Sequence, residues 1–118
     1  MTKRRNAVVA VISAAVLALT GFVSVSAASA ASVQVGVILP DAASSARWET
    51  ADRKFLAAAF KAASVTADIQ NANGDKAKFA TIADQMMAKG VKVLIMAGLD
   101  SPSTAAIQAK AAKAGVKT

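Results

Sequence analysis

The sequence has no histidine, cysteine or tyrosine among its 118 residues, and it has one tryptophan. Without histidine and cysteine, the Ser-His-Asp and Cys-His nucleophile systems, zinc fingers, thiol redox pairs and disulfide frameworks are excluded. The glycines never form G-x-G-x-x-G, and no Gly-Lys pair is present for a P-loop. Dinucleotide and nucleotide sites built on those motifs are therefore excluded as well. The length allows one small domain at most, and no cofactor is predicted.

Residues 1–30 have the pattern of a targeting segment. Three basic residues near the start precede an apolar run from Ala7 to Leu19, and Ala28-Ser29-Ala30 forms an A-x-A cleavage site. The apolar run is shorter than the roughly 20 residues that a transmembrane helix needs. The pattern therefore favours a cleaved signal peptide over an uncleaved membrane anchor. It predicts a protein that is secreted, periplasmic or held in the cell envelope.

The chain is basic, with 14 Lys and Arg residues against seven Asp and Glu residues and a net charge of +7. Without residues 1–30, eleven basic and seven acidic residues remain, and the net charge falls to +4. The remaining lysines are scattered and are not interleaved with aromatic residues, as a groove for nucleic acid requires. They indicate a solvated surface, and no nucleic-acid partner is predicted.

The part after residue 30 alternates between strand and helix patterns. Apolar runs at 33–39, 65–69 and 91–96 predict buried strands, and the last of them has the composition of a central strand covered on both faces. Each run is followed by a stretch of helical periodicity. In the first helix, the apolar stripe predicted to face the core consists of Trp48, Ala51, Phe55, Ala58 and Ala62, with Asp52, Arg53 and Lys61 facing outward. The βαβαβα order predicts an α/β fold with an open parallel sheet and flanking helices.

The end of the chain repeats the pattern that introduces the third strand. Ala114-Gly115-Val116-Lys117-Thr118 follows a helix as Ala88-Lys89-Gly90-Val91-Lys92 does. Thr118 is therefore expected at the opening of a fourth strand. Three strands cannot cover the apolar faces of three helices on both sides of a sheet. Residues 31–118 are accordingly predicted to be a truncated first part of a larger lobe.

Three acidic residues follow predicted strands, where ligands meet open α/β sheets. Asp41, Asp75 and Asp100 are these residues, and a hard cation would take such carboxylates as ligands. Helix capping explains Asp75 and Asp100 more simply. No metal site is predicted.

The tract from Pro40 to Arg53 places Arg47 and the only tryptophan, Trp48, after the first strand. Neutral sugars are bound by this mixture, because an aromatic face packs on the C–H side of the ring while charged groups bond its hydroxyls. The alternative is that Trp48 is the first core residue of its helix and Arg47 a surface charge. Composition alone favours that alternative.

Several tracts in order closely resemble the sugar-binding proteins of ABC importers. These tracts are Pro40-Asp41 through Arg47-Trp48, Ala51-Asp52-Arg53, Asn71-Ala72-Asn73-Gly74-Asp75 and Gly90 to Ile95. The nearest likeness is to the xylose-binding branch of the type 1 periplasmic binding proteins, and it covers residues 33–118. It implies two α/β lobes that close on a monosaccharide and present it to a membrane permease of the ABC transporter.

The resemblance also implies roles for particular residues. Arg47 and Trp48 match positions that hold the sugar, whereas Asp41 and Asp100 are weaker matches. The Asn-Ala-Asn-Gly-Asp turn is interpreted as structural. The implied protein is not an enzyme, and it is exported by its signal peptide.

Two other classes share the alternation of strands and helices. One is an exported or cytosolic flavodoxin-like α/β enzyme whose catalytic residues lie beyond Thr118, because fold alone does not determine function. The other is a sugar-sensing regulator, which is weakened by the export signal and by the lack of a helix-turn-helix before the first strand.

Overall fold

Strands and helices alternate along the described part of the protein. The computed structural model describes residues 32–118, so the predicted signal peptide lies outside the described residues. None of the helices in residues 32–118 combines the length and the hydrophobicity that a membrane span requires. The elements in chain order are β1 (Val35–Leu39), the π-helix η1 (Trp48–Asp52), α1 (Arg53–Ala62), β2 (Ala67–Asn71), α2 (Lys76–Ala88), β3 (Val93–Met96) and α3 (Ser101–Lys113).

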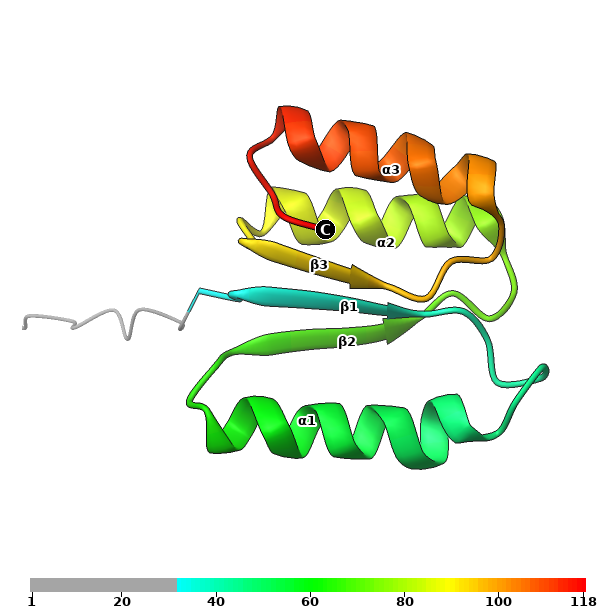
Figure 1. Ribbon diagram of the computed structural model, residues 1–118, viewed down its shortest axis with the longest axis vertical. Coiled ribbons are helices and arrows are strands. Elements are labelled where there is room, and N and C mark those ends of the chain that lie inside the picture. The colour runs from blue at the N-terminus through cyan, green and yellow to red at the C-terminus, as the bar shows by residue number, and fades with distance from the viewer. Residues whose placement is uncertain (1–31) are drawn as a thin grey trace, which may run out of the picture.

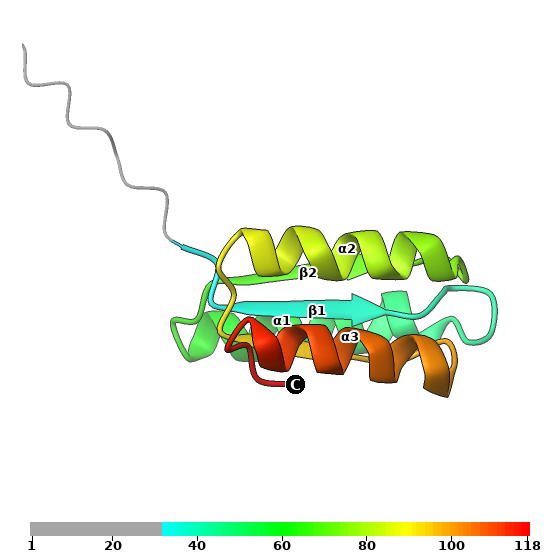
Figure 2. The same ribbon diagram turned by 90° about the horizontal axis from the view of Figure 1, so that it is seen from above.

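The three strands form a parallel sheet in the order β2-β1-β3. In this register Val37 of β1 is paired with Ile69 of β2 and with Ile95 of β3. Helix α1 covers one face of the sheet, and α2 and α3 lie on the other (Figure 1). Seen from above, α2 and α3 lie on either side of β1 (Figure 2). The connection from β1 to β2 runs across the sheet in one direction, and the connection from β2 to β3 runs in the opposite direction. Because both crossovers have the same handedness, α1 and α2 lie on opposite faces of the sheet. The predicted open α/β sheet is confirmed.

The last residues of the chain pair with β3. Lys117 forms a parallel bridge with Val93: its N–H donates to the carbonyl of Lys92 at 3.0 Å, and its carbonyl accepts from the N–H of Leu94 at 2.8 Å. The segment expected to open a fourth strand therefore lies along the free edge of β3.

The main core lies between the sheet and the pair α2 and α3. Its largest fully buried side chains include Ile38, Phe79, Met86 and Leu94. Gly36 of β1 is also buried, directly against Met86, because it has no side chain of its own. The other members of this cluster are Ala72, Ile82, Ala83, Val91, Ile107, Ala111 and Val116.

The predicted inner face of the first helix is wrong by one position. Phe55 is 66% exposed, whereas Leu56 and Phe60 are half-buried, and Arg53 is half-buried instead of facing outward. The reason is η1: the N–H of Arg53 bonds the carbonyl of Trp48 five residues earlier, not four. Each residue after this π-turn therefore points in the direction that an unbroken α-helix would give to the residue before it. The predicted stripe members Ala58 and Ala62 are exposed as a result.

Two strand predictions also differ from the structure. Among the described residues β1 is the strand covered on both faces, whereas β3 has Ile95 41% exposed. The second strand begins at Ala67, not Val65, because the turn that closes α1 takes up residues 63–65. Ser64 takes a left-handed conformation with φ 55°, and the N–H of Val65 bonds back to the carbonyl of Phe60 at 2.8 Å.

Candidate functional site

The carboxyl ends of the three strands meet at one edge of the sheet, and backbone hydrogen bonds tie their loops together. The N–H of Gly74 donates to the carbonyl of Pro40, and the N–H of Ala97 donates to the carbonyl of Ile38, at 2.9 and 3.0 Å. The loops after β1, β2 and β3 thus leave from the same edge, which is where open α/β sheets bind ligands (Figure 1). All four residues predicted to contact sugar lie in these loops or at the helix starts that follow them.

Arg47 and Trp48 lie where the loop after β1 enters η1. The guanidinium carbon of Arg47 lies 4.7 Å from the centroid of the Trp48 ring, within the range of a cation–π contact. Arg47 also forms a bidentate ion pair with Asp52, from Nε to Oδ2 at 2.8 Å and from Nη2 to Oδ1 at 3.2 Å. This hydrogen-bonded carboxylate raises the pKa of Arg47, so the guanidinium remains a charged donor. The structure therefore brings the two strongest sequence candidates into contact with each other.

The indole and guanidinium differ in how much of them is in contact with water. The Arg47 side chain is 62% exposed. Trp48 is half-buried, and its Nε1 atom is buried with no hydrogen-bond partner in residues 32–118. The pair therefore presents an exposed array of donors beside a partly covered aromatic ring.

Asp41 shapes the loop between β1 and η1. Its carboxylate accepts hydrogen bonds from the N–H of Ser44 at 2.5 Å and from the Ser44 hydroxyl at 2.9 Å. These bonds to the ionised form lower the pKa of Asp41. The geometry is that of a local turn. A sugar contact by Asp41 remains a prediction.

Asp100 caps α3. Its carboxylate accepts from the N–H of Ser103 at 2.7 Å and from the Ser103 hydroxyl at 3.1 Å, and it pairs with the ammonium of Lys76 at 2.7 Å. The pair with Lys76, together with the bonds from Ser103, lowers the pKa of Asp100 to about 2. Capping and the ion pair account for its position, and a sugar contact by Asp100 remains a prediction.

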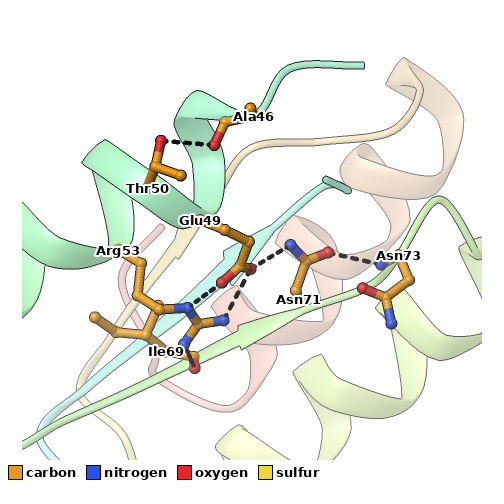
Figure 3. Close-up of polar contacts among 7 residues, drawn as sticks. All are labelled: Ala46, Glu49, Thr50, Arg53, Ile69, Asn71 and Asn73. Atoms are coloured by element: carbon orange, nitrogen blue, oxygen red, sulfur yellow. Dashed lines mark hydrogen bonds and ion pairs between the residues drawn. The ribbon is translucent and has the colours of Figure 1, made fainter. Parts of the chain in front are cut away.

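Three residues that the sequence did not mark as functional form a network beneath η1 (Figure 3). The Glu49 carboxylate accepts from Arg53 Nε at 2.6 Å, from Arg53 Nη2 at 3.1 Å and from Asn71 Nδ2 at 2.6 Å. Arg53 Nη1 also donates to the carbonyl of Ile69 in β2 at 2.6 Å. Bonding by Arg53, and then by Asn71, lowers the pKa of Glu49 and keeps it ionised. The spacing of Glu49 and Arg53 is a sequence signal for an ion pair, but nothing local links either to Asn71.

The other places in residues 32–118 where a ligand could bind do not involve Arg47 or Trp48. This part of the chain contains no group of three or more side chains suited to hold a metal ion. An open surface cavity of about 450 Å³ lies along the start of α3, lined by Gly98, Asp100, Ser101, Thr104, Ala105 and Gln108. Arg47 and Trp48 take no part in it.

A comparison with known families decides what kind of protein carries this site. The periplasmic binding protein domain matches residues 35–118. The chain belongs to this family. Members of this family are solute-binding components of ABC transporters and are not enzymes. The family match therefore favours the binding-protein interpretation over the flavodoxin-like enzyme.

Two solved structures of sugar-bound proteins resemble this chain. One is a carbohydrate transporter solute-binding protein from Chloroflexus aurantiacus in complex with D-glucose, at 33% identity and a TM-score of 0.64. The other is an ABC transporter solute-binding protein from Clostridium phytofermentans with bound β-D-glucose, at 28% identity and a TM-score of 0.64. The matches cover 71% and 70% of this chain but 24% and 25% of those proteins, so this chain spans about a quarter of their length. A search of the curated proteins gave no match.

Proposed function

We propose that this chain provides one side of a monosaccharide-binding site in the substrate-capturing component of a carbohydrate ABC importer. The observation that carries the proposal is the contact between Arg47 and Trp48 at the carboxyl edge of the sheet. The likeness to two sugar-bound proteins supports it. Export by the signal peptide at residues 1–30 would deliver the protein outside the cytoplasmic membrane, where such a component meets its sugar.

The chemistry of the pair suits a neutral sugar. A guanidinium has five N–H donors, and Asp52 accepts from two of the five on Arg47. The other three are available to sugar hydroxyls. The guanidinium covers part of the indole. The C–H side of a sugar ring would pack on the part of the Trp48 ring that stays exposed. The two side chains then contact different parts of one sugar.

The preferred ligand is a xylose-like aldopyranose. The matched structures hold glucose. Xylose presents the same ring hydroxyls as glucose and lacks the hydroxymethyl group on C5, so the contacts available from Arg47 and Trp48 are common to both sugars. Contacts from outside residues 32–118 would then select between them, because a pocket that closes around C5 has no room for the extra group.

Capture is proposed to occur by closure of two lobes. The sugar binds the closed state better than the open state and so shifts the population towards it. The closed form is then recognised by the membrane permease. Residues 32–118 contribute only part of one lobe in this scheme. The isolated 118-residue chain is therefore expected to bind sugar undetectably by calorimetry, and tight binding by it would contradict the closure mechanism.

The test is sugar titration of the complete gene product by isothermal calorimetry, with xylose and glucose in separate runs. Arg47→Ala and Trp48→Ala are each expected to weaken binding at least about tenfold, since each removes hydrogen bonds or packing worth at least about 1.4 kcal/mol. Lys113→Ala is the matched control, because Lys113 is an exposed cation in the last turn of α3. Retention of wild-type affinity by the double variant of Arg47 and Trp48 would reject the proposal.

A further inference from the structure

Two arginine–carboxylate forks span the π-turn η1. On the inner side, Arg53 holds Glu49 through Nε and Nη2. On the outer side, Arg47 holds Asp52 in the same bidentate way. Such planar, charge-assisted pairs restrict the directions of both side chains more than a single hydrogen bond does.

The outer fork depends on the π-turn itself. Arg47 and Asp52 are five residues apart, and in an α-helix only residues three or four apart are neighbours on one face. The five-residue spacing of a π-turn brings them together, as the backbone bond between Arg53 and Trp48 shows. The fork that fixes the direction of Arg47 beside the Trp48 ring therefore depends on the π-turn.

The inner fork fastens this turn to β2. Glu49 also accepts from Asn71, and Arg53 donates to the carbonyl of Ile69, so two hydrogen bonds of 2.6 Å connect the fork to β2 (Figure 3). Asn71 in turn accepts from the N–H of Asn73 at 2.7 Å. The π-turn is thus connected to a neighbouring strand and to the turn that follows it.

We propose that Glu49, Arg53 and Asn71 are positioning residues that hold η1 in its π form and thereby set the directions of Arg47 and Trp48. The role in sugar binding rests on the function proposed above. None of the three needs to contact sugar. Their effect reaches the ligand through the backbone, because Glu49 follows Trp48 directly in the chain.

Trp48 is the only tryptophan in the 118-residue chain, and there is no tyrosine, so its fluorescence reports on this turn without sugar. Asn71→Asp replaces the amide donor, 2.6 Å from Glu49, with a second carboxylate. Two carboxylates at this distance repel, and one of them then keeps its proton to a higher pH. We expect the emission and acrylamide quenching of Trp48 to change at neutral pH in this variant and to return towards wild-type values on acidification.

The control is Asp84→Asn, which removes an exposed ion pair with Lys110 at 2.7 Å and leaves η1 untouched. Its Trp48 emission is expected to match that of the wild type at every pH. If Asn71→Asp does not fold by far-ultraviolet circular dichroism, Asn71→Ala removes the donor without adding charge and is expected to change the emission in the same direction. Wild-type emission and quenching in the folded variant would overturn the inference.

Sugar titration of the complete gene product then tests the functional consequence. Glu49→Gln and Asn71→Ala are expected to weaken binding about tenfold, while Asp84→Asn leaves it unchanged. Arg53→Lys is also expected to weaken sugar binding, because an ammonium keeps the charge but cannot form the planar pair with Glu49. Wild-type affinity in all three network variants would overturn the positioning role. If the wild type binds neither xylose nor glucose, the proposed sugar function fails, and Trp48 fluorescence alone decides whether the network holds the turn.

Discussion

Substitution of Gly36 tests how closely α2 packs on the central strand. A Cβ atom at this position would lie 2.6 Å from Met86 Sδ and 3.1 Å from Leu94 Cδ1, well inside the 3.4–4 Å of ordinary contact. Both neighbours are fully buried, so neither side chain has open space to move into. Gly36→Ala is therefore expected to overpack the core.

The expected cost follows from two opposing effects. Overpacking a well-packed core costs about 1–3 kcal/mol, whereas replacing glycine by alanine stabilises by about 0.4–1 kcal/mol through the unfolded chain. The net loss for Gly36→Ala is about 1–2 kcal/mol. With a urea slope of about 1 kcal/mol/M, the low end for small proteins, the unfolding midpoint moves down by about 1–2 M.

A double-mutant cycle with Met86→Ala identifies the cause. That substitution alone is expected to cost about 2–5 kcal/mol through the cavity it leaves. If overlap with Met86 is the reason, Gly36→Ala costs little or nothing when added to it, and the coupling is about 1–2 kcal/mol. Urea unfolding followed by circular dichroism measures all four proteins. An equal cost of Gly36→Ala in both backgrounds would refute the packing argument.

Three further changes test other parts of the fold. Phe79→Ala truncates the largest fully buried side chain and is expected to cost about 3–5 kcal/mol in urea unfolding; a cost below 1 kcal/mol would contradict its place in the core. The Asp75 carboxylate caps α2 by accepting from the N–H of Lys78 at 3.0 Å. Asp75→Ala removes this cap and is expected to lower the free energy of unfolding by about 1 kcal/mol, whereas unchanged stability would show that the cap is replaced. The folded pKa of Asp100 is about 2, below its ordinary 3.8, so its contribution to stability is present above pH 3.8 and is lost as the pH falls towards 2. Asp100→Asn is expected to flatten that part of the stability profile, and an unchanged acid limb would show that other carboxylates dominate it.

Features that depend on a few neighbouring residues were predictable. The alternation of strands and helices followed from the spacing of apolar residues, and the ends of α2 and α3 followed from Gly90 and Gly115, which have φ of 82° and 73°. The cap at Asp75 and the beginning of a further strand at the end of the chain were also anticipated, although the pairing of that segment with β3 was not. Each of these signals lies within about five residues of the feature that it predicts, so the sequence carries it locally.

The arrangement of the candidate site was only partly predictable. Arg47 and Trp48 were identified by residue type and by resemblance, but their contact and the fork with Asp52 depend on the π-turn. The same turn displaced the inner face of α1 from Phe55 to Leu56. Helical periodicity assumes 3.6 residues per turn throughout, so it cannot anticipate a turn with one additional residue.

The sequence by itself determined the type and order of the elements, the polar caps and the residue types available for sugar recognition. Only the tertiary structure decided which way those residues point. Glu49 and Asn71 are 22 positions apart, and no local pattern connects them until β2 has paired with β1. A contact between distant segments exists only once the intervening chain has folded, and here such a contact holds the π-turn that directs Arg47 and Trp48.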